Sequence, residues 1–164
     1  MYMIIFFVDQ NQKNTKLSQI IDLKKLENVN KPIEAANGLP NECYISKDYL
    51  RYERDKIFFN KWTVIGVGSS IPKSGDVITY NLLGIPLIIL RDKKMNIRVF
   101  HNVCSHRGYK LLEKPCNLKN VIRCPYHSWS YDFEGNLVAT PHVGGLNIHT
   151  VSYTHLRAHE TRPN

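Results

Sequence analysis

Long apolar runs are missing from this sequence of 164 residues. The uninterrupted apolar stretch at the N-terminus covers only residues 1–8, whereas a membrane-spanning helix needs about 20 apolar residues. The stretch also lacks a basic segment before it and a small-residue cleavage site after it, so it does not have the features of a secretory signal. From these absences we expect a cytoplasmic protein with no membrane span.

Cysteine is scarce as well, with four in the chain at uneven intervals. Small secreted domains are held together by closely spaced disulfides, and four unevenly placed cysteines do not provide such a framework. Metal ligation is therefore the first alternative for these residues. The cysteines are Cys43, Cys104, Cys116 and Cys124.

Acidic residues are outnumbered, because 14 Asp and Glu occur with 22 Lys and Arg, which gives a net charge of +8. A basic chain suggests a nucleic-acid partner. However, the basic residues are spread along the chain, and no basic run interleaved with aromatics is present, as a dedicated DNA-binding surface would require. We expect a solvated basic surface and no nucleic-acid partner.

After Trp62 the sequence contains short stretches that are rich in β-branched residues, and they predict a mainly β domain of antiparallel sheets. Turn-forming residues separate the expected strands, and no stretch between them is long enough for the helix that a parallel crossover needs. The expected strands are residues 63–67, 77–83, 85–90, 97–103, 129–133 and 137–140.

One or two helices are expected before this domain. Residues 17–26 have apolar residues at roughly helical spacing, and Ser46 is a suitable N-cap for a second helix. The apolar face of the second helix is expected to pack, and it comprises Tyr49, Leu50, Ile57 and Phe58.

We divide the chain into three parts. Residues 1–38 are predicted to form a polar, partly helical arm, residues 39–141 the folded domain, and residues 142–164 a tail. Residues 151–164 share no apolar period with the domain and resemble a translated sequencing-adapter read. We therefore expect that segment to be non-native and the chain to be truncated.

Two short motifs carry the chemistry of the sequence. Cys104-Ser105-His106 is a C-x-H pair, and Cys124-Pro125-Tyr126-His127 is a C-x-x-H pair, with 17 residues between His106 and Cys124. Thiolates and imidazoles in equal number suit zinc or iron–sulfur chemistry, whereas calcium and magnesium prefer oxygen ligands. Each motif lies at an end of an expected strand, where the chain turns, so two hairpin tips are expected to close on one centre. One zinc ion with four ligands satisfies this spacing, and so does a two-iron cluster with the cysteines on one iron and the histidines on the other.

The extended motifs Cys104-x-His106-Arg107-Gly108 and Cys124-Pro125-Tyr126-His127-x-Trp129 resemble the Rieske domain of ring-hydroxylating and related Rieske non-haem iron oxygenases. The resemblance covers residues 39–141. It implies a [2Fe-2S] cluster in which Cys104 and Cys124 ligate one iron while His106 and His127 ligate the other. The residues to which it gives supporting roles near the cluster are Arg107, Gly108, Tyr126 and Trp129.

Two positions separate the branches of Rieske proteins. The respiratory branch carries a disulfide between a cysteine directly after the glycine of the first motif and one directly before the second histidine, where this chain has Tyr109 and Tyr126. In addition, Trp129 replaces a hydroxyl that bonds to cluster sulfur in that branch, and it is expected to pack beneath the second loop as an aromatic shield. The resemblance thus implies a lower-potential site, as in an oxygenase or its ferredoxin.

The resemblance implies the N-terminal part of an oxygenase large (alpha) subunit, an oxidoreductase of the kind found among monooxygenases, dioxygenases and enzymes of aromatic hydrocarbon catabolism. In the family, the cluster accepts electrons from a reductase or ferredoxin and passes them to a mononuclear Fe(II) held by two histidines and a carboxylate in a C-terminal domain. The sequence after Pro141 is too short for that domain. No catalytic residue is therefore expected in this chain, which alone is not expected to hydroxylate a substrate, whereas the full-length family usually forms trimers.

Two other functions remain open at this stage, namely a stand-alone Rieske ferredoxin and a structural zinc module. Residues 39–62 resemble the oxygenase large subunit, which favours the oxygenase. The cysteines and histidines that are not expected to bind a metal ion are Cys43, Cys116, His101, His142, His149, His155 and His159.

Overall fold

The computed structural model describes residues 3–6, 16–141 and Leu156. The chain forms two compact units, a β unit of residues 1–6 and 64–164 and a helical unit of residues 7–63. This division lies at Thr63 and Val64, and the domain limits expected from the sequence, at residues 38/39 and 141/142, stay a prediction. The expected roles of residues 142–155 and 157–164, including their histidines, fall outside the described residues. None of the helices that the structure describes is both long and apolar enough to cross a membrane.

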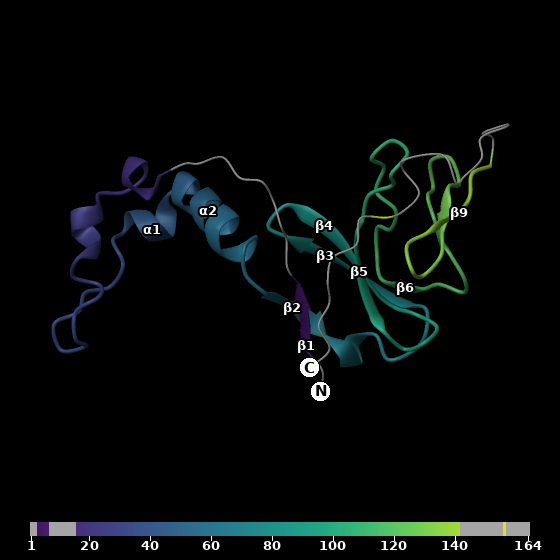
Figure 1. Cartoon of the computed structure of the whole chain (residues 1–164), viewed down its shortest axis with the longest axis horizontal. Coiled ribbons are helices and arrows are strands. Elements are labelled where there is room, and N and C mark those ends of the chain that lie inside the picture. The colour runs from purple at the N-terminus through teal and green to yellow at the C-terminus, as the bar shows by residue number, and fades with distance from the viewer. Residues whose placement is uncertain (1–2, 7–15, 142–155, 157–164) are drawn as a thin grey trace. The chain divides into compact units, whose positions relative to one another are not determined.

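The helical unit consists of short elements (Figure 1). Ser46 caps the longest of them as expected, because its hydroxyl oxygen accepts a hydrogen bond from the backbone N–H of Tyr49. Residues 17–26 form two separate 3₁₀ turns rather than one helix, because the Asp22 carboxylate accepts from the Lys24 N–H and starts a new turn there. The elements are η1 (Leu17–Gln19), η2 (Leu23–Leu26), α1 (Glu42–Ile45), α2 (Lys47–Glu53) and η3 (Arg54–Phe58).

The expected packing face of the second helix is only partly buried. Leu50 and Ile57 expose 53% and 49% of their surface, and Phe58 exposes 36%. Among the described residues of this unit, the buried hydrophobic side chains are Ile21, Cys43 and Phe59. The helical unit therefore has a very small core of its own.

The β unit contains an antiparallel four-stranded sheet in the order β5-β4-β3-β6 (Figure 1). Its three long strands confirm the prediction, since they are rich in β-branched residues and the central strand β4 is buried along Leu87 to Leu90. The two-residue strand β6 was not expected from the sequence. The strands are β3 (Asp76–Leu82), β4 (Ile85–Arg91), β5 (Ile97–His101) and β6 (Cys116–Asn117).

Two smaller sheets complete the β unit. One pairs β1 (Met3–Phe6) with β2 (Thr63–Val67), and the other has the order β7-β8-β9 with antiparallel neighbours. The expected strands at residues 129–133 and 137–140 are confirmed in shorter form, and β7 was not expected. The three strands of this sheet are β7 (Ile122–Arg123), β8 (Ser130–Tyr131) and β9 (Leu137–Ala139).

One hydrophobic core joins the four-stranded sheet to the β7-β8-β9 sheet. It combines Val77, Ile88 and Phe100 from the first sheet with side chains from the second. Cys104 and Cys124 belong to the same core, exposing only 1% and 2% of their surface. The further members of the core are Leu90, Leu111, Ile122, Trp129, Tyr131, Phe133, Leu137 and Leu156.

Candidate metal centre

Both Cys/His motifs lie in loops with the same backbone closure. In the first loop, residues 104–109, the Cys104 N–H donates to the Tyr109 carbonyl at 2.8 Å, and the Gly108 N–H donates to the Cys104 carbonyl at 2.9 Å. In the second loop, residues 124–129, the Cys124 N–H donates to the Trp129 carbonyl at 2.8 Å, and the Ser128 N–H donates to the Cys124 carbonyl at 3.0 Å. Each closure turns the chain back over its own cysteine.

The fifth residue of each loop has a left-handed backbone, with φ 67° at Gly108 and φ 59° at Ser128. Glycine adopts this conformation without strain, whereas serine does so at a cost. The second loop joins β7 to β8, which pair with each other, so it is a hairpin tip as expected. The first loop differs from that expectation, because it leads from β5 to β6 at opposite edges of one sheet.

The four candidate ligands form two pairs of like residues. The imidazole rings of His106 and His127 meet edge to face, with 4.8 Å between their centroids. The thiols of Cys104 and Cys124 are close enough to interact with each other. Each loop contributes one member to each pair, so the pairs form only when the two loops come together.

The cysteine pair lies in a dry environment. Burial raises the pKa of the Cys104 thiol above its usual value, the hydrogen bond with the Tyr131 hydroxyl lowers it in part, and the neighbouring Cys124 thiol raises it further. A thiol of this kind ionises when a cation takes the place of its proton. The cysteine pair therefore suits a metal that binds thiolate in an apolar core.

The histidine pair is less deeply buried than the cysteine pair, and both His106 and His127 are partly exposed. Burial lowers the pKa of His106, and the neighbouring His127 and Arg107 lower it further. The Nδ1 of His127 is buried, and no described residue provides a hydrogen-bond partner for it. A neutral imidazole with an unused ring nitrogen is the form in which histidine binds a metal ion.

The donor set therefore fits a cluster with two metal ions better than a single ion. The like pairs match a [2Fe-2S] cluster with both cysteines at one iron and both histidines at the other. The assignment of individual ligands stays a prediction.

The expected supporting residues lie within these two loops. Trp129 is 5% exposed, and its indole stacks on the His106 ring at 4.5 Å with an angle of 10° between the planes. It thus contacts the histidine of the first loop, whereas the sequence suggested packing beneath the second. Tyr126 packs against His127 with 3.8 Å between the ring centroids, and Arg107 is exposed beside His106.

Sequence reasoning missed Tyr131, four residues after His127. This side chain is fully buried, and its hydroxyl lies 3.3 Å from the Cys104 Sγ, 2.7 Å from the Ser105 Oγ and 3.2 Å from the Ser105 backbone nitrogen. A tyrosine in the middle of a strand that follows a ligand motif is the available signal, because a buried hydroxyl needs a polar partner. The other cysteines lie elsewhere, Cys116 exposed on β6 and Cys43 buried in the helical unit.

Comparisons with known proteins agree with this geometry. The family model of the Rieske [2Fe-2S] domain matches residues 61–152, which is more than half of the chain. The carnitine monooxygenase oxygenase subunit of Acinetobacter pittii (strain PHEA-2) is 34% identical over 130 residues, covering 77% of this chain and 35% of that protein. The benzene 1,2-dioxygenase subunit alpha of Pseudomonas putida (strain F1) is 33% identical over 109 residues, covering 66% of this chain and 24% of that protein.

A solved structure is similar in the same way. The quaternary ammonium Rieske monooxygenase CntA, in complex with an inhibitor, superimposes with a TM-score of 0.67 and 32% identity, covering 75% of this chain and 34% of that one. The chain thus spans between about a quarter and about a third of the length of these relatives, which are oxygenase subunits and oxygenases. With the family model matched over both loops, the chain belongs to the Rieske [2Fe-2S] domain family.

Proposed function

We propose that this chain is the Rieske electron-transfer region of an oxygenase alpha subunit, with Cys104 and Cys124 as ligands of one iron and His106 and His127 as ligands of the other. The observation that carries the proposal is the sorting of the four side chains into a cysteine pair and a histidine pair. A tetrahedral zinc site would bring all four to one point. When bound, a Rieske cluster supplies one-electron transfer at a higher potential than a cluster with four cysteine ligands.

The chain's own residues give the two pairs different surroundings. The cysteines lie in the core, where Tyr131 and the apolar side chains of both sheets exclude water. The histidines are partly exposed, and the adjacent Tyr126 exposes 52% of its surface. We therefore propose that electrons enter and leave on the histidine side.

The relatives are longer than this chain, and the part that this chain does not span bears on its partners. The aligned region is about a third of the carnitine monooxygenase subunit. We propose that a complete subunit takes electrons from a reductase or ferredoxin, delivers them to a mononuclear non-haem iron in the region that this chain does not span, and assembles into trimers. A cytoplasmic location stays part of this proposal.

Substrate choice belongs to the same unspanned region. The carnitine monooxygenase subunit and the benzene dioxygenase subunit are 34% and 33% identical to this chain, although their names give very different substrates. A region shared equally with both is unsuited to discriminate between a quaternary amine and an aromatic ring. We propose that the part of the subunit represented here serves either kind of oxidation.

The test of the cluster is anaerobic purification of the chain, followed by iron and acid-labile sulfide analysis and EPR spectroscopy after dithionite reduction. We expect iron and sulfide in equal amounts and a Rieske-type signal. Cys104→Ser and Cys124→Ser should each lose both, whereas Cys116→Ser, which changes an exposed cysteine outside the loops, should retain them. A colourless protein containing zinc would contradict the proposal.

A second test separates the oxygenase from a stand-alone ferredoxin. Sequencing the transcript downstream of the codon for residue 150 should reveal two histidines and an Asp or Glu arranged for a mononuclear iron. An early stop codon there would instead make the chain a ferredoxin-like electron carrier.

A further inference from the structure

The two loops are related by more than their cysteines. Counting from each cysteine, the N–H of the cysteine bonds to the carbonyl five residues on, and the residue four positions on has a positive φ. In this common frame, His106 and Tyr126 occupy the same position, two residues after the cysteine. Tyr109 and Trp129 also occupy the same position, five residues after the cysteine.

In each loop, the ring that lies five residues after the cysteine packs on the ring that lies two residues after the cysteine of the other loop. Trp129 stacks on His106 with 4.5 Å between centroids, and Tyr109 packs on Tyr126 with 5.4 Å between centroids. The two contacts thus join equivalent positions reciprocally, although the Trp129 and His106 rings are within 10° of parallel and the Tyr109 and Tyr126 rings are tilted by 38°. The Trp129–His106 contact is the inner contact, because Trp129 is only 5% exposed. The Tyr109–Tyr126 contact is the outer contact, because these side chains expose 47% and 52% of their surface.

The inner contact includes the candidate ligand His106 itself. The outer contact does not include a ligand, but its Tyr126 ring packs on the candidate ligand His127. Tyr126 packs on His127 with 3.8 Å between centroids and an angle of 34°. The rings therefore form a continuous series from Tyr109 through Tyr126 to His127. We propose that Tyr109 is a positioning residue, which holds the His127 ring through Tyr126 as Trp129 holds the His106 ring.

Side chains are the natural means of holding these loops together. The backbone hydrogen bonds given above close each loop on itself, so they do not fix one loop against the other. On the cysteine side, the core and the Tyr131 hydroxyl make the connection, because Tyr131 follows the second loop and bonds to Cys104 and Ser105 of the first. On the histidine side, the Tyr109–Tyr126 contact is the corresponding connection near solvent.

Removal of Tyr109 should therefore loosen the histidine side selectively. Aromatic pairs of this type change an equilibrium about two- to tenfold. This inference rests on the proposed function, since it concerns the orientation of a cluster ligand. The contact between Tyr109 and Tyr126 is made by their rings, so phenylalanine should replace Tyr109 without loss.

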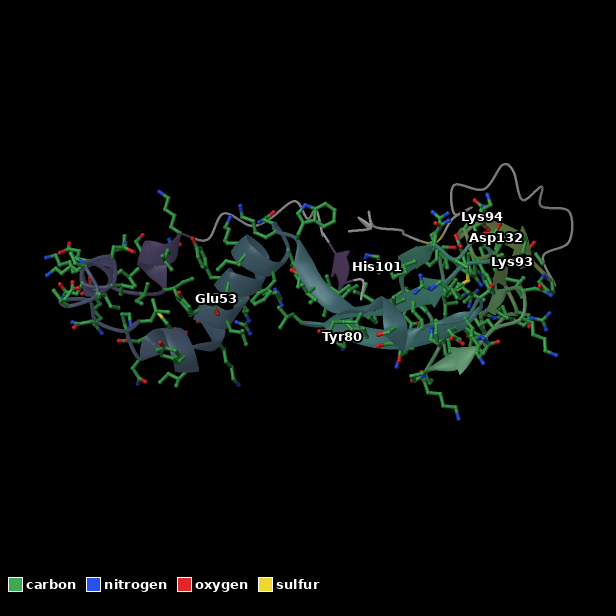
Figure 2. All side chains as sticks on the ribbon, turned by 90° about the horizontal axis from the view of Figure 1, so that it is seen from below. Glu53, Tyr80, Lys93, Lys94, His101 and Asp132 are labelled. Carbon is green, nitrogen blue, oxygen red and sulfur yellow. The ribbon has the colours of Figure 1, made fainter. Side chains whose placement is uncertain are left out.

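The test compares Tyr109→Ala with Tyr109→Phe and with Tyr80→Ala. Tyr80 lies on β3, is 39% exposed and is labelled in Figure 2, so its replacement controls for the loss of a half-exposed tyrosine elsewhere in the same unit. The readouts are the line shape of the reduced EPR signal, the histidine nitrogen couplings measured by ENDOR, and the rate at which a chelator removes iron.

We expect Tyr109→Ala to broaden the EPR signal, to change the coupling of one histidine nitrogen, and to accelerate iron loss about two- to tenfold. Tyr109→Phe and Tyr80→Ala should behave like the unmodified chain. If Tyr109→Ala retained the unmodified signal and rate, the positioning role would be refuted while the proposed function stood. If the unmodified chain gave no Rieske signal, the proposed function itself would fail.

A second variant covers the case in which Tyr109→Ala does not fold. Tyr109→Leu keeps apolar volume at the same position but removes the ring, and its fold is checked by circular dichroism and urea unfolding. A folded Tyr109→Leu chain with altered histidine couplings supports the proposal. Unfolding of both variants would show that Tyr109 contributes to general stability and would overturn the positioning role.

Discussion

The hydroxyl of Tyr131 lies 3.3 Å from the Sγ of Cys104. The ring is fully buried on β8, and Ser105 of the first loop holds the hydroxyl from the other side at 2.7 Å. A neutral hydroxyl near a thiolate stabilises negative charge on sulfur. Since reduction adds negative charge to a cluster, hydrogen bonds to its sulfur ligands raise the reduction potential.

Tyr131→Phe should therefore lower the reduction potential of the [2Fe-2S] cluster when the chain carries it. The expected decrease is on the order of 40 mV, which corresponds to about 1 kcal/mol for a one-electron step. The measurement is a redox titration followed by circular dichroism or EPR spectroscopy. Tyr80→Phe removes an exposed hydroxyl from β3 and should leave the potential unchanged. An unaltered potential in Tyr131→Phe would show that this hydroxyl does not act on a cluster sulfur.

The long strands could be predicted from sequence because β-branched residues fill them and turn-forming residues separate them. β2 agrees with its predicted bounds, and β3, β4 and β5 differ only at their ends. β6 and β7 have two residues each, which is too short for any period to appear. The expected helix at residues 17–26 fails for a local reason, because Asp22 competes for the backbone as a cap.

Residue types and spacing alone could predict the candidate site in its chemistry but not in its arrangement, which only the resemblance to Rieske domains supplied. Residue types and spacing identified two Cys/His motifs and left zinc and iron–sulfur chemistry open. The sorting of cysteine with cysteine and histidine with histidine depends on how the loops approach each other, and this is decided by the packing of the core around Cys104 and Cys124. The contacts of Tyr131 and Tyr109 are tertiary for the same reason, since no local pattern encodes a partner that is 27 residues away in the chain, as for Tyr131, or 17 residues away, as for Tyr109.

Gly75 and Gly84 offer a matched test of how closely the β unit is packed. Both have a positive φ, 84° and 97°, so an alanine at either position is strained. At Gly75 the added Cβ would lie 2.0 Å from the carbonyl oxygen of Leu118, whereas nothing lies within 4 Å of a Cβ at Gly84. The Gly75 carbonyl also accepts a hydrogen bond from the Leu118 N–H at 2.8 Å. This bond holds the segment between the two Cys/His loops, in which Leu118 lies, against the turn at Gly75.

Gly84→Ala should thus lower the free energy of unfolding by about 1–2 kcal/mol, the cost of the left-handed backbone alone. Gly75→Ala should lower it by more than about 3 kcal/mol, because the backbone of Leu118 has to move as well. Urea unfolding monitored by circular dichroism measures both changes. Equal effects of the two substitutions would contradict the close approach at Gly75.

Two turns of the β unit are built on the same pattern, an Asp followed four residues later by an Asn. Asp92 accepts hydrogen bonds from the backbone N–H of Lys94 and of Asn96, and Asp132 accepts from those of Glu134 and Asn136. Figure 2 labels Lys93 and Lys94 of the first turn and Asp132 of the second. The turns differ in two respects, since Asp92 also accepts from the Arg98 guanidinium at 3.0 Å, and Asp92 is fully buried whereas Asp132 is only partly buried.

The pKa of Asp92 is lower than its ordinary value. Burial alone would raise it, but the Asn96 N–H, the Arg98 guanidinium and the Asn96 side chain together outweigh this effect by stabilising the ionised form. A carboxyl whose pKa is depressed by folding stabilises the protein above its unfolded pKa, near 4, and this contribution is lost as the pH falls through its folded pKa. Asp92 should therefore contribute to stability at pH 7 and make the protein sensitive to acid below about pH 4.

Asp92→Asn should lower the free energy of unfolding at pH 7 by about 1.5–3 kcal/mol, with the lower end favoured because the Arg98 side chain is 40% exposed. Asp132→Asn, the matched substitution in the turn without a guanidinium bond, should cost about 1 kcal/mol. Urea unfolding of both variants between pH 7 and pH 3 measures the difference. The deficit of Asp92→Asn relative to the unmodified chain should shrink as the pH falls from about 4 toward the folded pKa of Asp92, because the unfolded carboxyl takes up a proton first and the native carboxyl follows at lower pH. A deficit that stays constant down to pH 3 would mean that Asp92 stabilises its turn through shape and neutral hydrogen bonds rather than through its charge.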